Sequence, residues 1–342
     1  MLGVKVPRAL AEEFRVTLAR KGYVDKTLAI LDDGQSIAIP LLKEPWAEVM
    51  DTYHAALVDR DFPSRKTRTD PIDQVRAMVA VPESLKLFLP EKWEQLGDVV
   101  VVKLPKELNA HERDIGEAYA KALKAKTVLR DVGGVSGNLR TPVVKTLFGT
   151  DPVAVHTENG ILYKLDASKV MFSSGNVDER MRMAGIECDG ETIVDMFAGI
   201  GYFTLPIAVY QRPRRIISCE LNEVSHGYLV ENIALNKVEG KVEPILGDNR
   251  DLPGDAFADR VIMGYVKTTH EFLQTAFRLL KSGGVIHYHE TCPNELLPER
   301  PVKRLREAAR KSKVEVLRFK EVKSYSPGVS HVVVDARFTR TS

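Results

Sequence analysis

The sequence predicts an α/β protein in which a mainly parallel sheet carries helices on both faces, preceded by small α+β domains. From residue 192 onward, short apolar runs of strand length alternate with segments of helical periodicity, which is typical of parallel strands joined by helices. The first such run leads into Asp195–Phe203, a glycine-rich turn between a strand and a helix. The last two strands, Glu315–Lys323 and His331–Arg337, are joined through Ser326-Pro-Gly328 and are expected to form an antiparallel edge.

The composition is that of a globular protein. The 342 residues are enough for two or more domains, with 44% hydrophobic and 28% charged residues. No apolar run approaches the roughly 20 residues of a membrane helix, and no signal-peptide core is present, so we expect a cytoplasmic protein without membrane contact. The three cysteines, Cys188, Cys219 and Cys292, form no CxxC pair, which favours a reducing compartment and argues against zinc. The net charge of +2 does not decide the partners.

Residues 1–60 are expected to form a small N-terminal module and a linker. Apolar residues at four-residue spacing predict a helix from Ala9 to Lys21, followed by strands at Leu28–Leu31 and Ser36–Leu42. The stretch Arg60–Arg68 is polar and basic, and it is either a linker that touches an anionic partner or a plain solvated linker.

Residues 75–172 are expected to form an α+β domain that contributes to the ligand site described below. Its glycine-rich segment Gly133–Pro142 contains Arg140, which either presents a guanidinium to a phosphate or a base or belongs to a flexible surface loop. The turn Asn159-Gly160 suits a tight hairpin. The expected elements are Asp98–Leu104, His111–Leu123, Thr127–Arg130, Val153–His156 and Ile161–Leu165.

Residues 173–342 are expected to form the main domain, with its ligand beyond the carboxyl ends of the strands. The expected strands and helices, in order, are Thr192–Phe197, Tyr202–Tyr210, Arg215–Leu221, Val224–Leu235, Val242–Leu246, Asp259–Met263, His270–Leu280, Gly284–His289 and Val302–Lys311.

The turn after the first strand points to a nucleoside ligand. Gly199 and Gly201 let the backbone turn tightly and approach a ligand. Thr204 replaces the third glycine of the dinucleotide fingerprint, so no close approach of a pyrophosphate is indicated. Asp195 ends the strand, where it can face a positively charged amino-acid group, and Phe197 is a further candidate contact to the ligand.

Two further strand ends are also acidic. Glu220 follows Gly199 by roughly 20 residues, a spacing at which a carboxylate accepts hydrogen bonds from both ribose hydroxyls. Asp248 can accept from the adenine amino group and Asn249 can orient the ring. A surface position near the following helix is the alternative for Glu220. Three acidic strand ends in succession favour an adenosine site and resemble the pattern of class I S-adenosylmethionine-dependent transferases.

The fourth strand ends in Met263-Gly-Tyr-Val-Lys-Thr-Thr-His270, without the prolines and the Asn or Asp that amino-methyltransferases usually place there. Tyr265 and His270 are candidate contacts to the substrate, as is Arg140; for His270 the alternative is capping or packing of the next helix.

On the fifth strand, alternation places His287 and His289 on one face and the intervening Tyr288 on the other. Two histidines without a third ligand make a poor metal site, so no metal is expected.

The segment before the main domain is a candidate for the amino-acid end of the ligand. Ser173 and Arg180 can hold a carboxylate, with charge-assisted hydrogen bonds from the guanidinium. The alternative interpretation, compatible with the first, is a helix start at which Asn176 is the cap and Glu179 completes a capping box.

As a set, these motifs resemble the archaeal and eukaryotic family of enzymes that modify tRNA at position 37. That family contains the guanine-37 N1-methyltransferases and the wybutosine-synthesis aminocarboxypropyltransferases. The resemblance covers about residues 75–338, and residues 1–43 resemble the N-terminal domain of the methyltransferase branch. The segment 263–270 resembles the aminocarboxypropyl branch, because the methyltransferase branch has an asparagine- and proline-containing motif there. The motifs that carry the resemblance to the family as a whole are Arg140 in Gly-Asn-Leu-Arg-Thr-Pro, Met171–Arg182, Asp195–Phe203, Asp248-Asn249 and His287-Tyr-His.

The resemblance implies transfer of the 3-amino-3-carboxypropyl group of S-adenosylmethionine to carbon 7 of 4-demethylwyosine at position 37 of phenylalanine tRNA. No general base is named. Guanine-37 N1-methyl transfer is the alternative, and a catalytically silent tRNA-binding protein is a rival of another class. The tRNA is the expected partner of a monomeric protein. The basic stretch expected to attract its phosphates, with a solvated helix face as the alternative, comprises Arg300, Lys303, Arg304, Arg306, Arg310, Lys311 and Lys313.

Overall fold

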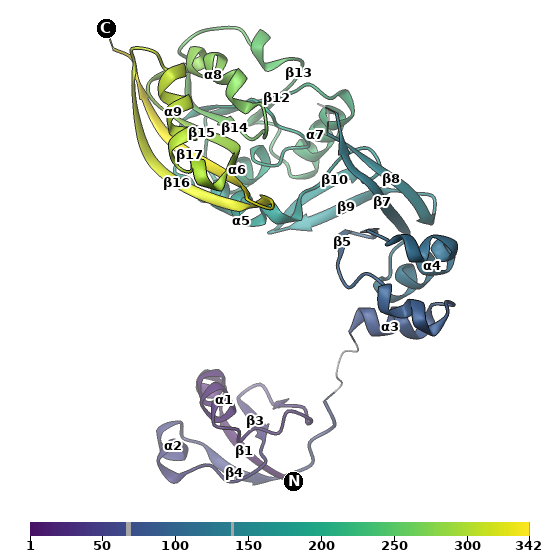
Figure 1. Ribbon diagram of the computed structural model, residues 1–342. Helices are drawn as coiled ribbons and strands as arrows, with labels where there is room; N and C mark the ends of the chain where they lie inside the picture. The colour runs from purple at the N-terminus through teal and green to yellow at the C-terminus, as the bar shows by residue number, and fades with distance from the viewer. Residues whose placement is uncertain (66–69, 138–139, 342) are drawn as a thin grey trace. The chain divides into compact units, whose positions relative to one another are not determined.

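The computed structural model describes residues 1–65, 70–137 and 140–341, and the chain forms two compact units, Met1–Asp70 and Pro71–Ser342 (Figure 1). Part of the basic stretch Arg60–Arg68 lies outside the described residues, as do Asn138 and Leu139 of the glycine-rich segment. Among the helices that the structure describes, none combines the length and the apolar character that a membrane span requires.

The first unit is a four-stranded sheet in the order β2-β3-β1-β4 with one main helix packed on it. The predicted helix is confirmed as α1 (Ala11–Arg20), whose Phe14 and Leu18 are fully buried. The strand β1 was not predicted, and of the expected strand at residues 28–31 only Leu31 lies in a strand, the two-residue β2. The bounds are β1 Leu2–Pro7, β2 Leu31–Asp32, β3 Ser36–Pro40, α2 Ala47–Thr52 and β4 Ala56–Asp59.

The second unit begins with a four-stranded sheet in the order β5-β6-β7-β8, with α3 and α4 packed on it. The expected glycine-rich loop is shorter than predicted, because β7 continues through Gly133 and Gly134 to Ser136, and β8 pairs with it in an antiparallel arrangement. The bounds are α3 Pro71–Met78, β5 Trp93–Leu96, β6 Val99–Val102, α4 Glu112–Leu123, β7 Thr127–Ser136 and β8 Thr141–Phe148.

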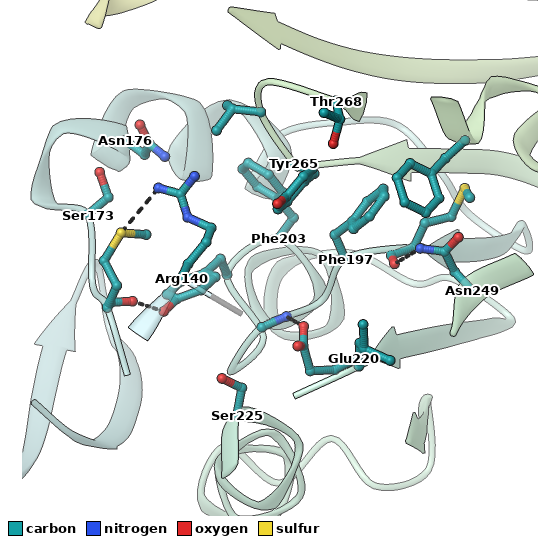
Figure 2. Close-up of a pocket in the computed structure, with 18 of the residues that line it drawn as sticks. Arg140, Ser173, Asn176, Phe197, Phe203, Glu220, Ser225, Asn249, Tyr265 and Thr268 are labelled. Carbon is teal, nitrogen blue, oxygen red and sulfur yellow. Dashed lines mark hydrogen bonds between the residues drawn. The ribbon is translucent and has the colours of Figure 1, made fainter. Parts of the chain in front are cut away.

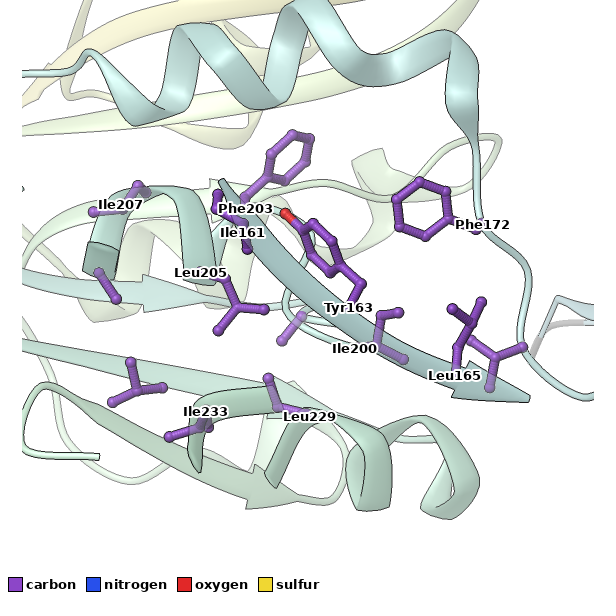
Figure 3. Close-up of a cluster of buried hydrophobic side chains, with 14 of the residues drawn as sticks. Ile161, Tyr163, Leu165, Phe172, Ile200, Phe203, Leu205, Ile207, Leu229 and Ile233 are labelled. Atoms are coloured by element: carbon purple, nitrogen blue, oxygen red, sulfur yellow. The ribbon is translucent and has the colours of Figure 1, made fainter. Parts of the chain in front are cut away.

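The predicted hairpin is confirmed as β9 (Val153–Glu158) and β10 (Ile161–Asp166), with Asn159 and Gly160 at positive φ in the turn. The hairpin packs on the main domain: the side-chain amide of Asn232 accepts from the Lys164 N–H at 2.6 Å and donates to the Lys164 carbonyl at 3.1 Å. Figure 3 shows Tyr163 of β10 among the apolar side chains of this contact.

The main sheet has seven strands in the order β13-β12-β11-β14-β15-β17-β16, of which the first five are parallel and the last two are antiparallel. This confirms the predicted fold class and the antiparallel edge. The bounds are β11 Thr192–Asp195, β12 Arg215–Glu220, β13 Val242–Leu246, β14 Ala258–Met263, β15 Leu280–Pro293, β16 Lys313–Ser326 and β17 Val329–Thr339.

Helices cover both faces of this sheet, because successive strand residues point to opposite sides. Ile193 and Ile216 pack with α5, α6 and α7, whereas Val194 and Ile217 pack with α8 and α9. The strand order reverses at β11, between β12 and β14, which places a ligand site beyond the carboxyl ends of these strands. The bounds are α5 Val177–Ala184, α6 Thr204–Tyr210, α7 Glu223–Leu235, α8 Leu273–Leu279 and α9 Glu299–Ala308.

Candidate functional site

A cavity of about 440 Å³ lies at the carboxyl ends of β11, β12, β13 and β14 (Figure 2). The predicted site residues Asp195, Gly201 and His270 lie outside its lining. The lining contains the other predicted residues, which are Arg140, Ser173, Arg180, Phe197, Gly199, Glu220, Asp248, Asn249 and Tyr265.

The glycine turn is fixed to the end of the second strand. Gly199 has a φ of +56°, and its N–H donates to the Glu220 carboxylate at 2.7 Å. Gly201 has a φ of +102° and faces the core, because a Cβ there would lie 2.6 Å from Cγ of Leu205. Gly199 therefore approaches the ligand space, while Gly201 lets the chain enter α6.

In Glu220, each of the two carboxylate oxygens accepts a hydrogen bond from a backbone N–H group. Its second oxygen accepts from the Asn222 N–H at 2.8 Å, and burial raises the pKa of Glu220 above its usual value. Each carboxylate oxygen has a further lone pair, so both can also accept from hydroxyl groups in the cavity.

Asp195 is directed into the protein instead of toward the cavity. It is fully buried, and it accepts from Oγ1 of Thr204 at 2.9 Å and from the Phe197 N–H at 3.3 Å. Oγ1 of Thr204 also contacts Oγ of Ser218 at 2.8 Å. Burial raises the pKa of Asp195 to about 6. Asp195, which was expected to face an amino group of the ligand, thus stabilises the turn, because its carboxylate accepts hydrogen bonds from Thr204 and from the Phe197 N–H.

Asp248 and Asn249 differ in what they offer to the cavity. Asp248 accepts two hydrogen bonds from the side chain of Arg250, which lower the pKa of this carboxyl. Asn249 is buried and donates to the Met196 carbonyl at 2.8 Å, whereas its own Oδ1 has no hydrogen-bond partner among the described residues. A buried amide oxygen without a partner is costly, so Asn249 is suited to accept from a ligand N–H.

Aromatic rings form one wall of the cavity. The rings of Phe197 and Tyr265 are stacked, with centroids 5.1 Å apart and an interplanar angle of 18°. Phe272 meets Phe197 edge-on at 5.0 Å. This wall is flat and apolar, which suits the face of a planar heterocycle.

At the other end of the cavity, Ser173 and Arg180 lie together, as predicted. The Arg180 guanidinium donates to both carboxylate oxygens of Glu158 at 2.6 Å and to the Ser173 carbonyl at 3.0 Å. It also lies over the ring of Phe172. The charge of Arg180 is thus already balanced, and its direct contact with a ligand carboxylate stays a prediction.

The expected capping box does not form. Asn176 occupies the N-cap position of α5, but its side chain accepts no capping hydrogen bond. Glu179 is completely buried and pairs with Arg182 at 2.6 Å instead of reaching back to the helix start. The Oδ1 atom of Asn176 is buried without a partner among the described residues, and the residue lines the cavity.

Comparison with known proteins identifies relatives of this chain. Residues 154–317 match the family model of the TRM5/TYW2 methyltransferase domain, residues 76–152 that of the TYW2 N-terminal domain, and residues 3–48 that of the tRNA methyltransferase 5 N-terminal domain. The chain is 46% identical over 259 residues to the tRNA(Phe) (4-demethylwyosine(37)-C(7)) aminocarboxypropyltransferase of Pyrococcus horikoshii, covering 75% of this chain and 92% of that protein. The chain belongs to the TRM5/TYW2 family.

The relatives of this chain come from both branches of the TRM5/TYW2 family, the aminocarboxypropyltransferases and the methyltransferases. The protein of the same name from Methanocaldococcus jannaschii is 48% identical over 252 residues, which are 73% of this chain and 98% of that protein. The tRNA (guanine(37)-N(1))-methyltransferase Trm5b of Pyrococcus abyssi is 34% identical over 98% of both chains. The structure of P. horikoshii TYW2 in complex with MeSAdo covers 79% of this chain and 100% of that chain, with 43% identity and a TM-score of 0.72.

The end of the fourth strand, where the sequence departs from the methyltransferase pattern, lies against the aromatic side chain of Phe203. A Cβ at Gly264 would lie 2.6 Å from Cε2 of Phe203. The Phe203 ring lines the cavity and stacks on His289 with centroids 5.2 Å apart. His270 is half-buried in a 3-10 turn (Thr269–Phe272), and its Nδ1 has no partner among the described residues.

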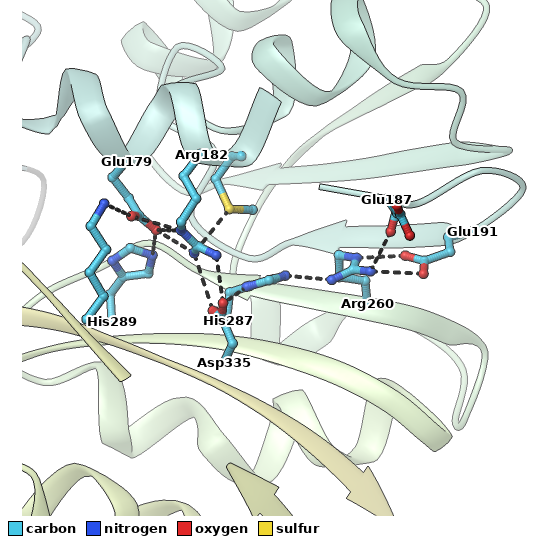
Figure 4. Close-up of polar contacts among 10 residues, drawn as sticks. Glu179, Arg182, Glu187, Glu191, Arg260, His287, His289 and Asp335 are labelled. Carbon is cyan, nitrogen blue, oxygen red and sulfur yellow. Dashed lines mark hydrogen bonds and ion pairs between the residues drawn. The ribbon is translucent and has the colours of Figure 1, made fainter. Parts of the chain in front are cut away.

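The histidines of the fifth strand belong to a buried polar network between α5, β15 and β17 (Figure 4). As predicted, both lie on one face of the strand, while Tyr288 packs in the opposite core. Nδ1 of His287 is 2.6 Å from Asp335, which also accepts from Arg182 at 2.6 Å. Among the described residues, no group of three or more His, Cys, Asp or Glu side chains is arranged to hold a metal ion.

His331 of β17 is a cavity residue that the sequence analysis did not single out. Its Nε2 is 3.0 Å from Nδ1 of His289, and burial lowers the pKa of both histidines to about 3. Both rings are therefore neutral at ordinary pH. The pairing of β15 with β17 brings His331 to the site, and no local sequence motif predicts this position.

About half of the predicted basic stretch has structural partners. Arg300 and Arg304 both donate to Glu290, whose carboxylate is almost fully buried, at 2.8 and 2.6 Å. Lys303 lies 3.7 Å from Glu307. The exposed cations of the stretch without such an ion pair among the described residues are Arg306, Arg310, Lys311 and Lys313.

Proposed function

We propose that this chain transfers the 3-amino-3-carboxypropyl group of S-adenosylmethionine to carbon 7 of 4-demethylwyosine at position 37 of tRNA(Phe). The observation that carries the proposal is the 46% and 48% identity to two archaeal enzymes of that name, over 92% and 98% of their lengths. Solved TYW2 structures in complex with MeSAdo and with AdoMet support the same donor.

In this proposal the acidic end of the cavity binds the adenosine part of the donor. Glu220 accepts from the ribose hydroxyls, and the unpartnered Oδ1 of Asn249 accepts from the adenine amino group. Asp248 lies beside them in the lining, and the aromatic wall of Phe197 supplies the apolar surface. Ser173 and Arg180, at the other end, hold the amino-acid part of the donor.

The donor supplies a sulfonium group that activates three carbon atoms, so the position in which the chain holds it selects the carbon that reacts. Carbon 7 of the base attacks the γ-carbon, the bond to sulfur breaks, and 5′-methylthioadenosine leaves while carbon 7 loses its proton. Gly264 offers no side chain to accept a proton from the base, in contrast to the asparagine of the methyltransferase branch. Tyr265 and His270 remain proposed contacts to the base.

We also propose the domain roles and the partner. The part covering residues 75–172 contributes Arg140, which lies between β7 and β8, together with Val170 and Met171, and residues 173–342 provide the rest of the lining. Residues 1–60 form the separate N-terminal module. The tRNA phosphates are attracted by the exposed cations at the end of α9. The chain is proposed to act as a monomer.

A guanine-37 N1-methyltransferase is the second candidate, favoured by one specific observation. The family model of the tRNA methyltransferase 5 N-terminal domain matches residues 3–48, and the Trm5b relative aligns over 98% of this chain.

The two candidates are separated by donors labelled in different groups. The protein is incubated with S-adenosylmethionine labelled in the methyl or in the carboxyl group, and with tRNA bearing guanosine or 4-demethylwyosine at position 37. Carboxyl label on the tricyclic base, with release of 5′-methylthioadenosine, is the expected outcome. Methyl label on guanosine, with release of S-adenosylhomocysteine, would replace the proposal with the second candidate.

A further inference from the structure

Lys323 brings an unbalanced positive charge to one end of the cavity. It lies on β16 and reaches the cavity lining, where its Nζ donates to Oγ of Ser173 at 2.6 Å. The side chain is partly buried, and no ion pair of Lys323 occurs among the residues that the structure describes. A partly buried ammonium group with only a hydroxyl as acceptor is a binding position for an anion.

The neighbouring charged groups make the surroundings of Lys323 more positive and so favour binding of an anion. Burial and repulsion from Arg140 and Arg180 lower the pKa of Lys323, and only Glu94, too distant for an ion pair, opposes them. Arg180 is balanced by Glu158, whereas the guanidinium of Arg140 meets the neutral sulfur of Met171 at 3.3 Å. The charges of Lys323 and Arg140 are therefore both available to a ligand in the cavity.

The side chain of Lys323 packs against the backbone at Gly175, where an added side chain would crowd it. A Cβ at Gly175 would lie 3.2 Å from both Cδ and Nζ of Lys323, closer than ordinary contact. The next residue is Asn176, whose buried Oδ1 has no partner because the expected cap does not form. An ammonium donor and an amide oxygen acceptor thus both line the end of the cavity that contains Ser173, a pattern complementary to a zwitterionic amino acid.

We propose that Lys323 and Asn176 bind the carboxylate and the ammonium group, respectively, of the donor's amino-acid end. Ser173 lies beside Lys323, and Arg140 adds positive charge near the carboxylate. This inference rests on the proposed function for the identity of the donor. Because the carboxylate moves with the transferred group, Lys323 keeps its contact during the reaction, whereas the contacts to adenosine stay with the leaving 5′-methylthioadenosine.

The test compares three ligands that differ in the groups concerned. S-Adenosylmethionine carries the carboxylate and the ammonium, decarboxylated S-adenosylmethionine lacks the carboxylate, and 5′-methylthioadenosine lacks both. Their affinities are measured by calorimetry for the full chain, for Lys323→Gln and for Arg318→Gln, a control at an exposed position of the same strand. Lys323→Gln is expected to weaken S-adenosylmethionine binding about 10- to 100-fold and to leave the other two ligands unchanged.

Asn176→Ala is expected to weaken binding of both ligands that carry the ammonium group and to spare 5′-methylthioadenosine. Lys323→Arg should restore most of the affinity lost in Lys323→Gln, which separates loss of charge from loss of folding. An equal loss for all three ligands in Lys323→Gln would overturn the inference, because it would show a structural role.

The same anion site suits a phosphate of the tRNA, and the binding data separate the two sources. If Lys323→Gln binds S-adenosylmethionine normally but tRNA more weakly, the site belongs to a phosphate and the inference is wrong. These affinities do not depend on which carbon is transferred. Methyl label on guanosine in the labelling experiment would therefore overturn the proposed function while leaving the calorimetric result intact.

Discussion

Gly264 lies at the carboxyl end of β14, where the ring of Phe203 leaves no room for a side chain. In Gly264→Ala, the added methyl group would lie 2.6 Å from Cε2 and 2.9 Å from Cδ2 of Phe203. Ordinary carbon contacts are about 3.5–4.0 Å, so the ring has to move by about 1 Å. His289 is fully buried and stacked on this ring, which restricts the movement of the ring away from Gly264.

The expected result is a loss of both stability and activity. Overpacking of this kind lowers the free energy of unfolding by about 1–3 kcal/mol. Because Phe203 lines the cavity, a displacement of about 1 Å at the reacting groups is expected to lower kcat by up to about 100-fold. Urea unfolding and single-turnover transfer of carboxyl-labelled donor measure the two effects.

Gly227→Ala is the matched control. Gly227 lies within α7, and a Cβ there meets no atom within 4 Å, so alanine is expected to be neutral or slightly stabilising. Phe203→Leu combined with Gly264→Ala should recover part of the lost stability, because the smaller side chain relieves the contact. If Gly264→Ala matches Gly227→Ala in both stability and kcat, the steric argument is refuted.

Three further outcomes are expected. Arg180→Ala should lower the free energy of unfolding by about 3–5 kcal/mol, because it leaves Glu158 partly buried and unpaired; a second change, Glu158→Gln, should recover part of this, and no recovery would argue against the pair. Asp195 has a folded pKa of about 6 against an unfolded value of 3.8, so the native state binds the proton more tightly. Its contribution is therefore fully present below the unfolded pKa and is lost as the pH rises toward 6; Asp195→Asn should remove this slope in unfolding measured between about pH 4 and 6, and an unchanged slope would contradict the assignment. Arg306→Gln and Lys311→Gln should each reduce the slope of log K for tRNA against log salt by about 0.7–0.9, and an unchanged slope would exclude them as phosphate contacts.

The main domain was predictable because its elements are long, apolar and regularly alternating. The strand Val242–Leu246 agrees with the prediction at both ends, and α7 begins one residue before the predicted start. The N-terminal module was less predictable. β1 is an inner strand of its sheet, yet in Leu2–Pro7 the fully buried core side chains are Val4 and Val6, with Leu2 partly buried, a pattern too short to identify a strand without its partners.

The placement of candidate site residues was predictable where it follows directly from the position of a residue at a strand end, and Glu220 and Asn249 both line the cavity. The role of a residue was not predictable where a distant partner decides what its side chain can do. Arg180 meets Glu158 from the preceding hairpin, and Asp195 meets Thr204 from the following helix. In both cases a charged side chain at a suitable position is engaged by the protein itself, and sequence spacing does not show this.

The antiparallel edge explains why the cavity contains residues from the end of the chain. β16 and β17 are paired over most of their lengths, and the chain reverses between Ser326 and Val329, so the hairpin tip lies beyond the carboxyl end of β15. Lys323 and His331 both lie near this tip and both line the cavity. An edge formed only to complete the sheet would need neither a partly buried lysine nor a buried histidine at that point. Their placement supports the proposal that the hairpin forms part of the ligand site, and the affinity of Lys323→Gln for the three ligands tests this directly.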